Sequence, residues 1–308
     1  MNSVVFSGRP HITLKQTGRY VGGSRKGFYT LKNDQLQPAQ LAPLAEFLSE
    51  CLMILKNFKL FDTHLHIIDN RFPLVPNNGY LPAPFTCKDY LDRMEGYALV
   101  GGAIVSGSFQ ALDQTYLVDA IKKLGPSFVG VTQVPVSVSD EELIELDFAG
   151  VRAVRFNLKR GGSEEVKHLD SLARRVYELL GWHVELYVDS SELASLYRVL
   201  VALPSVSIDH LGLSSEGFVT LLKLVENGVH VKATGFGRVN FDIKTALKDL
   251  FSANPDSLMF GTDLPSTRAP RPYEDNDFAL VVEALGAEDA CKVLYENAET
   301  FYRPSKIG

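Results

Sequence analysis

From residue 59 onward, short apolar runs rich in β-forming residues alternate with stretches of helical periodicity such as 112–124 and 165–180. Strands that alternate with helices predict parallel βαβ connections. Eight such units in about 250 residues favour a (β/α)8 TIM barrel over an open sheet. The eight predicted strands are 59–64, 98–105, 128–134, 151–157, 183–188, 205–209, 229–234 and 258–262.

The first 58 residues do not show this alternation of strand-like and helix-like segments. We therefore expect an N-terminal extension over 1–58, followed by one barrel domain over 59–308. Within the extension, residues 38–55 place leucines at helical spacing, which predicts one helix packed on the outside or the bottom of the barrel. A helix that binds a partner is the alternative.

Composition limits the class of partner and the compartment. The net charge of −6 over 308 residues is spread without a basic stripe, which argues against nucleic acid and favours a small molecule. Three cysteines without a CxxC pair indicate a reducing compartment. The first 22 residues show no secretory apolar region and no run reaches membrane-spanning length, so we expect a cytoplasmic protein without a membrane partner. The sequence leaves the oligomeric state open.

The segment 61–66 reads Phe-Asp-Thr-His-Leu-His and ends the first predicted strand. Residues two apart on a strand point to the same face, so Asp62, His64 and His66 are expected to project together. In a parallel barrel, the carboxyl ends of the strands open onto the face where active sites lie. Two imidazoles at that position favour chemistry over packing.

Two more polar residues follow the ends of predicted strands: His210 after the sixth and Asp263 after the eighth. Strands one and eight are neighbours in a closed barrel, so Asp263, His210, His64 and His66 can converge. The alternatives are a carboxylate that caps a helix or anchors a loop, and a hydrogen-bonded structural histidine. The histidines expected to be structural are His11, His168, His183 and His230.

Several motifs resemble those of the amidohydrolase superfamily, across residues 59–303. Within that superfamily, the chain is similar to the branch that contains 2-pyrone-4,6-dicarboxylate lactonase and sugar-acid lactonases, through Gly-Val-Arg-Ala-Val-Arg-Phe-Asn at 150–157. The other motifs are Asp-Thr-His-Leu-His at 62–66, Asp-His-Leu-Gly at 209–212, Gly-Thr-Asp-Leu-Pro at 261–265 and Asn-Ala-Glu-Thr-Phe-Tyr at 297–302.

The resemblance implies a role for each of ten residues. Asp263 would be the general base on the hydrolytic water, and His64, His66 and His210 would surround and polarise the lactone carbonyl. Three arginines would hold substrate carboxylates, with three further polar contacts. These are Arg155, Arg160 and Arg238, and Tyr80, Ser108 and Tyr187.

The chain departs from the family pattern in two places. The segment after Arg155 is one residue shorter, which affects the match of Arg160. Leu-Pro-Ser follows Asp263 where the dicarboxylate lactonase has Trp-Pro-His. These differences leave the identity of the lactone open.

The position of Arg155 in its predicted strand also suggests a role, independently of the family resemblance. Its parity on the fourth predicted strand points it into the barrel with Asn157, and an inward guanidinium needs an anionic partner. A substrate carboxylate supplies one in bidentate geometry. An internal salt bridge with Asp62 or Glu185 is the alternative.

A metal is the open question of this site. His64, His66 and Asp263 form an N,N,O set suited to one divalent ion such as zinc. Binuclear members of the superfamily resemble one another in a lysine on strand four and a histidine on strand five, where this chain has Arg155 and Tyr187. A binuclear centre is therefore not expected, and we predict that no metal is required.

The favoured function is hydrolysis of a small carboxylated or sugar-acid lactone, by attack of water on the ring carbonyl. One alternative is a metal-dependent decarboxylase or another hydrolase of the amidohydrolase type. An alternative of another class is a non-catalytic, anion-binding barrel or scaffold. Tightly bound metal would favour the decarboxylase, and ligand binding without turnover would favour the scaffold.

Overall fold

The computed structural model describes residues 56–303. The predicted helix at 38–55 lies outside these residues, and the division into an extension and a barrel at residue 58 stays a prediction. Within the described part of the chain, no helix is long and apolar enough to cross a membrane.

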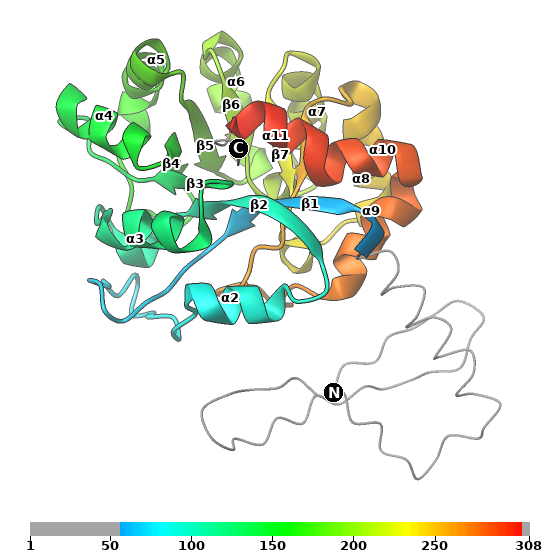
Figure 1. The fold of residues 1–308 in the computed structure, drawn as a ribbon. Helices are drawn as coiled ribbons and strands as arrows, with labels where there is room; N and C mark the ends of the chain where they lie inside the picture. The colour runs from blue at the N-terminus through cyan, green and yellow to red at the C-terminus, as the bar shows by residue number, and fades with distance from the viewer. Residues whose placement is uncertain (1–55, 304–308) are drawn as a thin grey trace. The chain divides into compact units, whose positions relative to one another are not determined.

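Eight parallel strands form one sheet in the order β1 to β8 (Figure 1). The two edge strands close it: Leu65 forms a parallel bridge with Leu264, and the amide of Asp263 donates to the carbonyl of His64 over 2.7 Å. The predicted (β/α)8 barrel is confirmed. The strands are β1 Lys59–Leu65, β2 Ala98–Val105, β3 Phe128–Thr132, β4 Val151–Asn157, β5 His183–Tyr187, β6 Val206–Ile208, β7 His230–Ala233 and β8 Leu258–Phe260.

Helices follow each strand and surround the barrel (Figure 1). The α-helices are α2 Cys87–Arg93, α3 Thr115–Leu124, α4 Asp140–Phe148, α5 Leu169–Leu180, α6 Leu193–Ala202, α7 Phe218–Glu226, α8 Ile243–Ala253, α9 Asp275–Leu285, α10 Ala287–Cys291 and α11 Asn297–Tyr302. Short helical turns are η1 Ser108–Gln110, η2 Val166–His168, η3 Ser190–Glu192, η4 His210–Gly212, η5 Phe236–Arg238 and η6 Lys292–Glu296.

The helices form because their apolar residues recur on one face. In α5, Leu169, Leu172, Ala173 and Val176 lie at helical spacing and are all buried against the barrel. The first turn of α4 is fixed by a capping box in which Ser139 and the Glu142 side chain satisfy free backbone amides. The predicted helical stretches 112–124 and 165–180 contain α3 and α5.

The last helix, α11, packs against the amino-terminal ends of the strands. The Phe301 ring lies 4.1 Å from the His183 ring and 4.0 Å from the His230 ring, measured between centroids, and these histidines begin β5 and β7. Tyr302 stacks on Phe61 of β1 at 5.5 Å. The two histidines therefore belong to the packing at the bottom of the barrel, as the sequence predicts.

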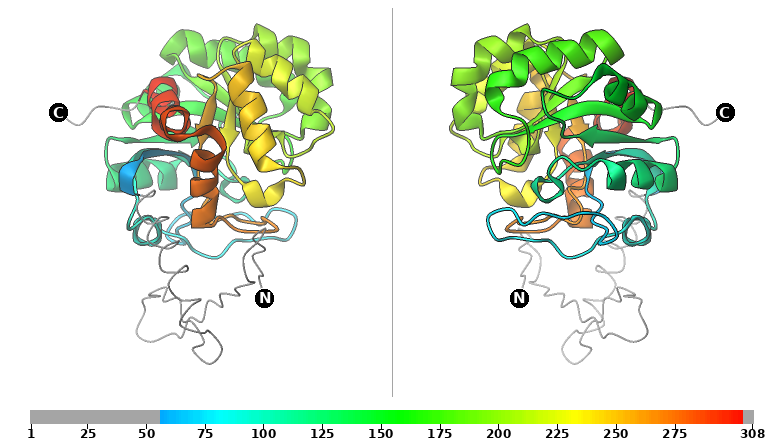
Figure 2. Two further views of the ribbon diagram at one scale, coloured as in Figure 1. Left: turned by 90° about the vertical axis from the view of Figure 1, so that its right-hand side faces the viewer. Right: turned by 90° about the vertical axis from the view of Figure 1, so that its left-hand side faces the viewer.

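The opposite end of the barrel carries the long loops. The segment between β1 and α2 and the segment between β8 and α9 lie side by side there (Figure 2). Hydrogen bonds from Arg268 to Asn77 join them directly. These loops sit over the carboxyl ends of the strands, where the predicted site residues lie.

Candidate active site

The site is built at the seam where β1 meets β8. His64 is in β1 and His66 follows it, while Asp263 is held opposite them by the hydrogen bond from its amide to the His64 carbonyl. His66 Nε2 lies 3.9 Å from Asp263 Oδ1, and the His64 ring centroid lies 5.0 Å from that of His66 and 4.7 Å from that of His210. All four side chains are buried, so the convergence expected from the sequence is present.

Two of these residues occupy strained backbone. His210 has φ +52° and Asp263 has φ +61°, in the left-handed region that non-glycine residues rarely adopt. Strands β6 and β8 end at Ile208 and Phe260, so both residues lie in the sharp turns that follow. Such strain clusters where a structure holds a side chain in a required direction, which is consistent with a functional role.

Asp62 does not share the direction of the two histidines, contrary to the expectation from strict alternation. Its carboxylate accepts hydrogen bonds from the Thr262 amide at 2.8 Å, the Thr262 hydroxyl at 2.7 Å and the Tyr90 hydroxyl of α2 at 3.1 Å. The pairing register of β1 is irregular between Asp62 and Leu65, which breaks the alternation. Asp62 thus connects β1 to α2 and to the segment that follows β8, outside the cavity.

The contacts of His66 fix its tautomer. Its Nδ1 lies 2.7 Å from the carbonyl oxygen of Val105, and only a protonated Nδ1 can make that hydrogen bond. Burial lowers the pKa of His66 well below its ordinary value, and the nearby His64 and Arg155 lower it further. His66 is therefore neutral near pH 7, with a lone pair on Nε2. It can accept a proton or bind a metal, but it cannot donate from Nε2.

His210 has the opposite capability. Its Nδ1 lies 2.7 Å from the Thr234 hydroxyl, which can donate to it and leave the proton on Nε2. Burial lowers the pKa of His210 well below its ordinary value, with His64 and Arg238 adding to the effect. A neutral His210 can thus present an N–H group to the cavity that it lines.

Asp263 is held by one oxygen and free at the other. Arg238 Nε donates to Asp263 Oδ2 over 2.7 Å, and the same guanidinium also donates to the Thr267 carbonyl. Asp263 Oδ1 is buried and has no hydrogen-bond partner among residues 56–303. Arg238, predicted to bind substrate, lines the cavity but is already paired with this carboxylate.

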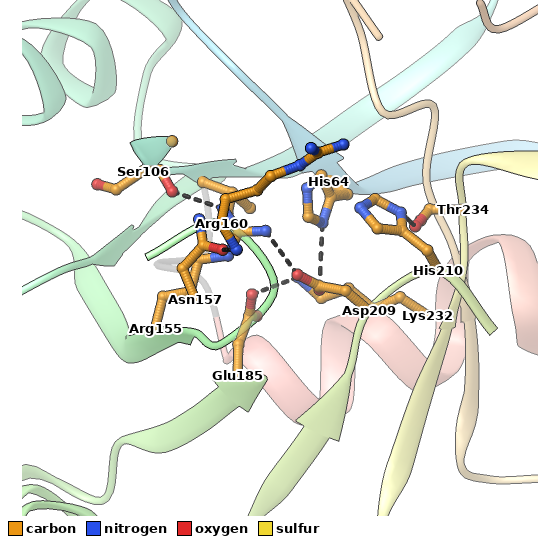
Figure 3. A network of polar contacts seen from close by, with 12 residues as sticks. His64, Ser106, Arg155, Asn157, Arg160, Glu185, Asp209, His210, Lys232 and Thr234 are labelled. Atoms are coloured by element: carbon orange, nitrogen blue, oxygen red, sulfur yellow. Dashed lines mark hydrogen bonds and ion pairs between the residues drawn. The ribbon is translucent and has the colours of Figure 1, made fainter. Parts of the chain in front are cut away.

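A charged network links Arg155, Asp209, Glu185 and Lys232 (Figure 3). Arg155 pairs with Asp209 at 2.7 Å and donates to the Ser106 carbonyl, so the internal salt bridge considered for Arg155 exists, although its partner is neither Asp62 nor Glu185. Lys232 contacts both Glu185 and Asp209. Burial alone would raise the pKa of Asp209, but its interactions with His64, Arg155 and Lys232 hold that pKa well below its usual range.

Most of the predicted residues line one cavity. His64 and Asp263 lie immediately behind it, in contact with the lining histidines. Tyr80 is outside the lining but its ring lies 4.2 Å from the guanidinium carbon of Arg268, which is inside it. The predicted residues in the lining are His66, His210, Arg155, Arg160, Arg238, Ser108 and Tyr187.

The sequence reasoning missed Arg268 and Lys232. Arg268 lines the cavity from the loop after β8, five residues beyond Asp263. Its position in a loop close to a candidate catalytic acid could have suggested a role. However, loop residues follow no periodicity from which the direction of a side chain could be predicted. Lys232 lies inside the barrel, and a lysine on a short strand gives no sign of its direction.

A family model for Amidohydrolase matches residues 61–303, most of the chain. The chain belongs to the amidohydrolase family. It is 29% identical over 279 residues to the 2-pyrone-4,6-dicarboxylate hydrolase of Comamonas testosteroni, covering 80% of this chain and 90% of that protein. It is 25% identical over 261 residues to the 4-sulfomuconolactone hydrolase of Rhizobium radiobacter, covering 77% of this chain and 87% of that protein.

A solved structure shares the fold of this amidohydrolase. It is a probable 2-pyrone-4,6-dicarboxylic acid hydrolase of Acinetobacter baumannii with citric acid bound, at a TM-score of 0.70 and 21% identity, covering 79% of this chain and 99% of the other. The predicted family and the prediction of a hydrolase are confirmed by these matches.

Members of the amidohydrolase family often bind metal, and the donor atoms here have the geometry for one ion. Ligand atoms of His64, His66 and Asp263 lie within 4.8 Å of one another. The free Nε2 of His66 and the unpartnered Oδ1 of Asp263 suit a divalent ion, and Asp209 at 3.3 Å from His64 Nδ1 resembles the outer partner of a metal-bound imidazole.

The buried histidines of this amidohydrolase predict a loss of stability in mild acid. Burial lowers the pKa of four histidines, and that of His230 falls to about 4. The unfolded chain takes up protons near pH 6.5, and the lowered pKa values delay this uptake in the folded protein, so the free energy of unfolding falls as the pH drops below 6.5. We expect urea unfolding to show a lower free energy at pH 5 than at pH 6, by up to about 1.4 kcal/mol for each histidine that stays neutral in the folded protein. The four are His66, His183, His210 and His230.

The carboxylates of the network do not interfere in this range. Burial raises the pKa of Glu185, but Lys232 and its other partners lower it to about 2, so its effect on stability belongs to more acidic solutions. An unfolding free energy that stays constant between pH 6 and pH 5 would contradict the neutral state assigned to the histidines.

Proposed function

We propose that this protein hydrolyses a small lactone bearing carboxylate or similar anionic groups, by addition of water to the ring carbonyl. One observation carries the proposal: two imidazoles and four arginines line a single cavity, and a buried carboxylate with one free oxygen and a third imidazole lie directly behind it. Two relatives support it, because their names identify hydrolases of anionic lactones. The proposed roles of individual residues follow from the geometry.

Asp263 and His66 are placed to orient the attacking water. Asp263 Oδ1 and His66 Nε2 are both acceptors and lie 3.9 Å apart. A water at about 2.8 Å from each would direct its two O–H bonds at them, at close to a right angle, and turn a lone pair towards the cavity. Asp263 then takes the proton as the new C–O bond forms.

His210 is the imidazole suited to the developing oxyanion. With Thr234 donating to Nδ1, its Nε2–H can donate to the carbonyl oxygen as that oxygen becomes negative. The lining guanidinium groups add positive charge to the same cavity. This assigns different roles to histidines that the sequence resemblance treats alike.

Collapse of the tetrahedral intermediate completes the reaction. The ring C–O bond breaks as the carbonyl re-forms, and the proton held by Asp263 passes to the departing ring oxygen. One water is consumed, and the lactone becomes an open-chain carboxylate with a hydroxyl or its keto tautomer. The new carboxyl group ionises at neutral pH, so turnover releases one proton to solution.

A panel assay tests the proposal. The protein is mixed with carboxylated lactones, including 2-pyrone-4,6-dicarboxylate, with aldono-lactones and with neutral lactones, and proton release is followed with a pH indicator. We expect turnover of the carboxylated or sugar-acid compounds. Binding of these compounds without any proton release would support the anion-binding scaffold instead, and release of carbon dioxide would support the decarboxylase.

Catalysis without a required metal is the expected mode. A bound divalent ion held by His64, His66 and Asp263 would supply Lewis acidity and lower the pKa of a bound water. However, the charges of Arg155, Arg238 and Lys232 already balance those of the nearby carboxylates, so an added divalent ion would leave a buried excess of positive charge. The balanced carboxylates are Asp209, Asp263 and Glu185.

We expect turnover to survive prolonged treatment with a chelator. The measurement is lactone hydrolysis before and after dialysis against EDTA, with elemental analysis of the protein for zinc and manganese. Loss of turnover that zinc or manganese restores, together with stoichiometric metal in the untreated protein, would show that His64 and His66 act as ligands.

A further inference from the structure

We propose that Arg268, together with Arg160, forms an anion-binding subsite in the outer part of the cavity that takes a second anionic group of the substrate. This inference rests on the proposed lactone hydrolysis and adds a feature of the substrate, an exocyclic carboxylate or sulfonate away from the carbonyl that is attacked. It assigns this role to a residue outside every motif of the sequence.

The arginines of the cavity fall into two pairs. The deeper pair is neutralised, because Arg155 contacts Asp209 and Arg238 contacts Asp263, both at 2.7 Å. Arg160 and Arg268 also line the cavity and are half-buried, but within residues 56–303 neither forms an ion pair with a carboxylate. The uncompensated positive charge of the cavity therefore lies at the outer pair.

Arg268 is held in place by neutral groups alone. Its Nη1 donates to Asn77 Oδ1 over 2.9 Å, and its Nη2 donates to the Asn77 carbonyl. Its guanidinium carbon lies 4.2 Å from the centre of the Tyr80 ring, in a cation–π contact. These contacts orient the planar group without cancelling its charge, which leaves it able to bind an oxyanion.

Asn77 connects the two arginines. While its Oδ1 accepts from Arg268, its Nδ2 donates to the backbone carbonyl of Arg160 over 3.2 Å. The loops after β1, β4 and β8 are thus joined at one asparagine, which keeps both guanidinium groups at the same cavity.

Two guanidinium groups at one cavity repel each other in the absence of an anion. Burial lowers the pKa of Arg268, and the charge of Arg160 lowers it further, as expected for neighbouring cations. An oxyanion placed between them relieves the repulsion and forms charge-assisted hydrogen bonds with both. A carboxylate and a sulfonate can both bind to a pair of guanidinium groups in this way. The substrate comparison described below distinguishes between them.

The first test measures binding without turnover, using citrate as a compact anion in calorimetric titrations. Arg268→Met is expected to weaken citrate binding about tenfold or more, and Arg268→Lys to weaken it less, since the charge remains but the planar fork is lost. Arg71→Met is the matched control, because Arg71 is 56% exposed and pairs with Asp69 outside the cavity. Unchanged citrate affinity in Arg268→Met, or no citrate binding by the wild type, overturns the subsite.

The second test compares substrates. Arg268→Met should raise KM for 2-pyrone-4,6-dicarboxylate about tenfold or more. The KM for 2-pyrone-6-carboxylate, which lacks the second anionic group, should stay nearly unchanged. Replacing the second carboxylate by a sulfonate shows which group the subsite prefers. An equal loss with both substrates means that Arg268 only supports the loop, which overturns the proposal. If no lactone is hydrolysed although citrate binding depends on Arg268, the subsite stands and the lactonase proposal fails.

Discussion

Asp263→Asn is expected to lower kcat for lactone hydrolysis by about two orders of magnitude or more while the protein stays folded. An amide has nearly the same shape and its oxygen can still accept the hydrogen bond from Arg238, so the turn at φ +61° should persist. What is lost is the free Oδ1, the atom placed to take a proton from water. The measurement is steady-state kinetics on the best lactone of the panel, with urea unfolding to verify stability.

A matched control replaces an exposed aspartate that lies outside the cavity. Asp170 pairs with Arg174 on the exposed face of α5, and Asp170→Asn should leave kcat unchanged. If Asp263→Asn keeps more than about a tenth of the wild-type kcat, another group is the base.

The sequence was sufficient to predict the barrel because its signals are redundant. Most strands carry buried apolar residues and most of the longer helices have an apolar face, so the loss of any one signal leaves the alternation visible. Closure of the barrel then brings residues after β1, β6 and β8 together whatever their separation in the chain. This is why His64, His66, His210 and Asp263 could be predicted to meet.

The partners of each side chain could not be predicted in the same way. Alternation fails at Asp62, because an irregularity in β1 turns it away from the histidines. Arg155 pairs with Asp209 and not with Asp62 or Glu185. Which acid lies opposite an arginine depends on the stagger of neighbouring strands, and sequence periodicity does not reveal that stagger. Arg268 and Asn77 meet through loops, whose paths depend on tertiary contacts.

The distinct capabilities of His66 and His210 also come from tertiary contacts. A carbonyl of β2 fixes the proton of His66 on Nδ1, while the hydroxyl of Thr234 can donate to Nδ1 of His210 and so leave a proton on its Nε2. The first partner lies on another strand and the second directly follows one, so the sequence motif alone cannot distinguish an acceptor from a donor. The chemistry of the site is therefore set by residues that carry no catalytic signature.

Lys232→Met is expected to lower the free energy of unfolding by about 3–5 kcal/mol, the usual cost of breaking a buried ion pair from one side. Lys232 is fully buried in β7 and contacts Glu185 and Asp209. The network holds two carboxylates and two permanent cations, Lys232 and Arg155. Without Lys232, the partners that Glu185 keeps among residues 56–303 are His183 and the Tyr302 hydroxyl, and one negative charge remains buried without compensation.

Urea unfolding of two further variants separates the charge from the packing. Lys244→Met removes an exposed lysine that pairs with Glu283, and it should cost less than about 1 kcal/mol. The double variant Lys232→Met with Glu185→Gln removes both charges of the central pair, so it should be more stable than Lys232→Met alone. If the double variant is no more stable than the single one, the loss comes from packing around the lysine side chain, and the charge balance assigned to the barrel interior is wrong.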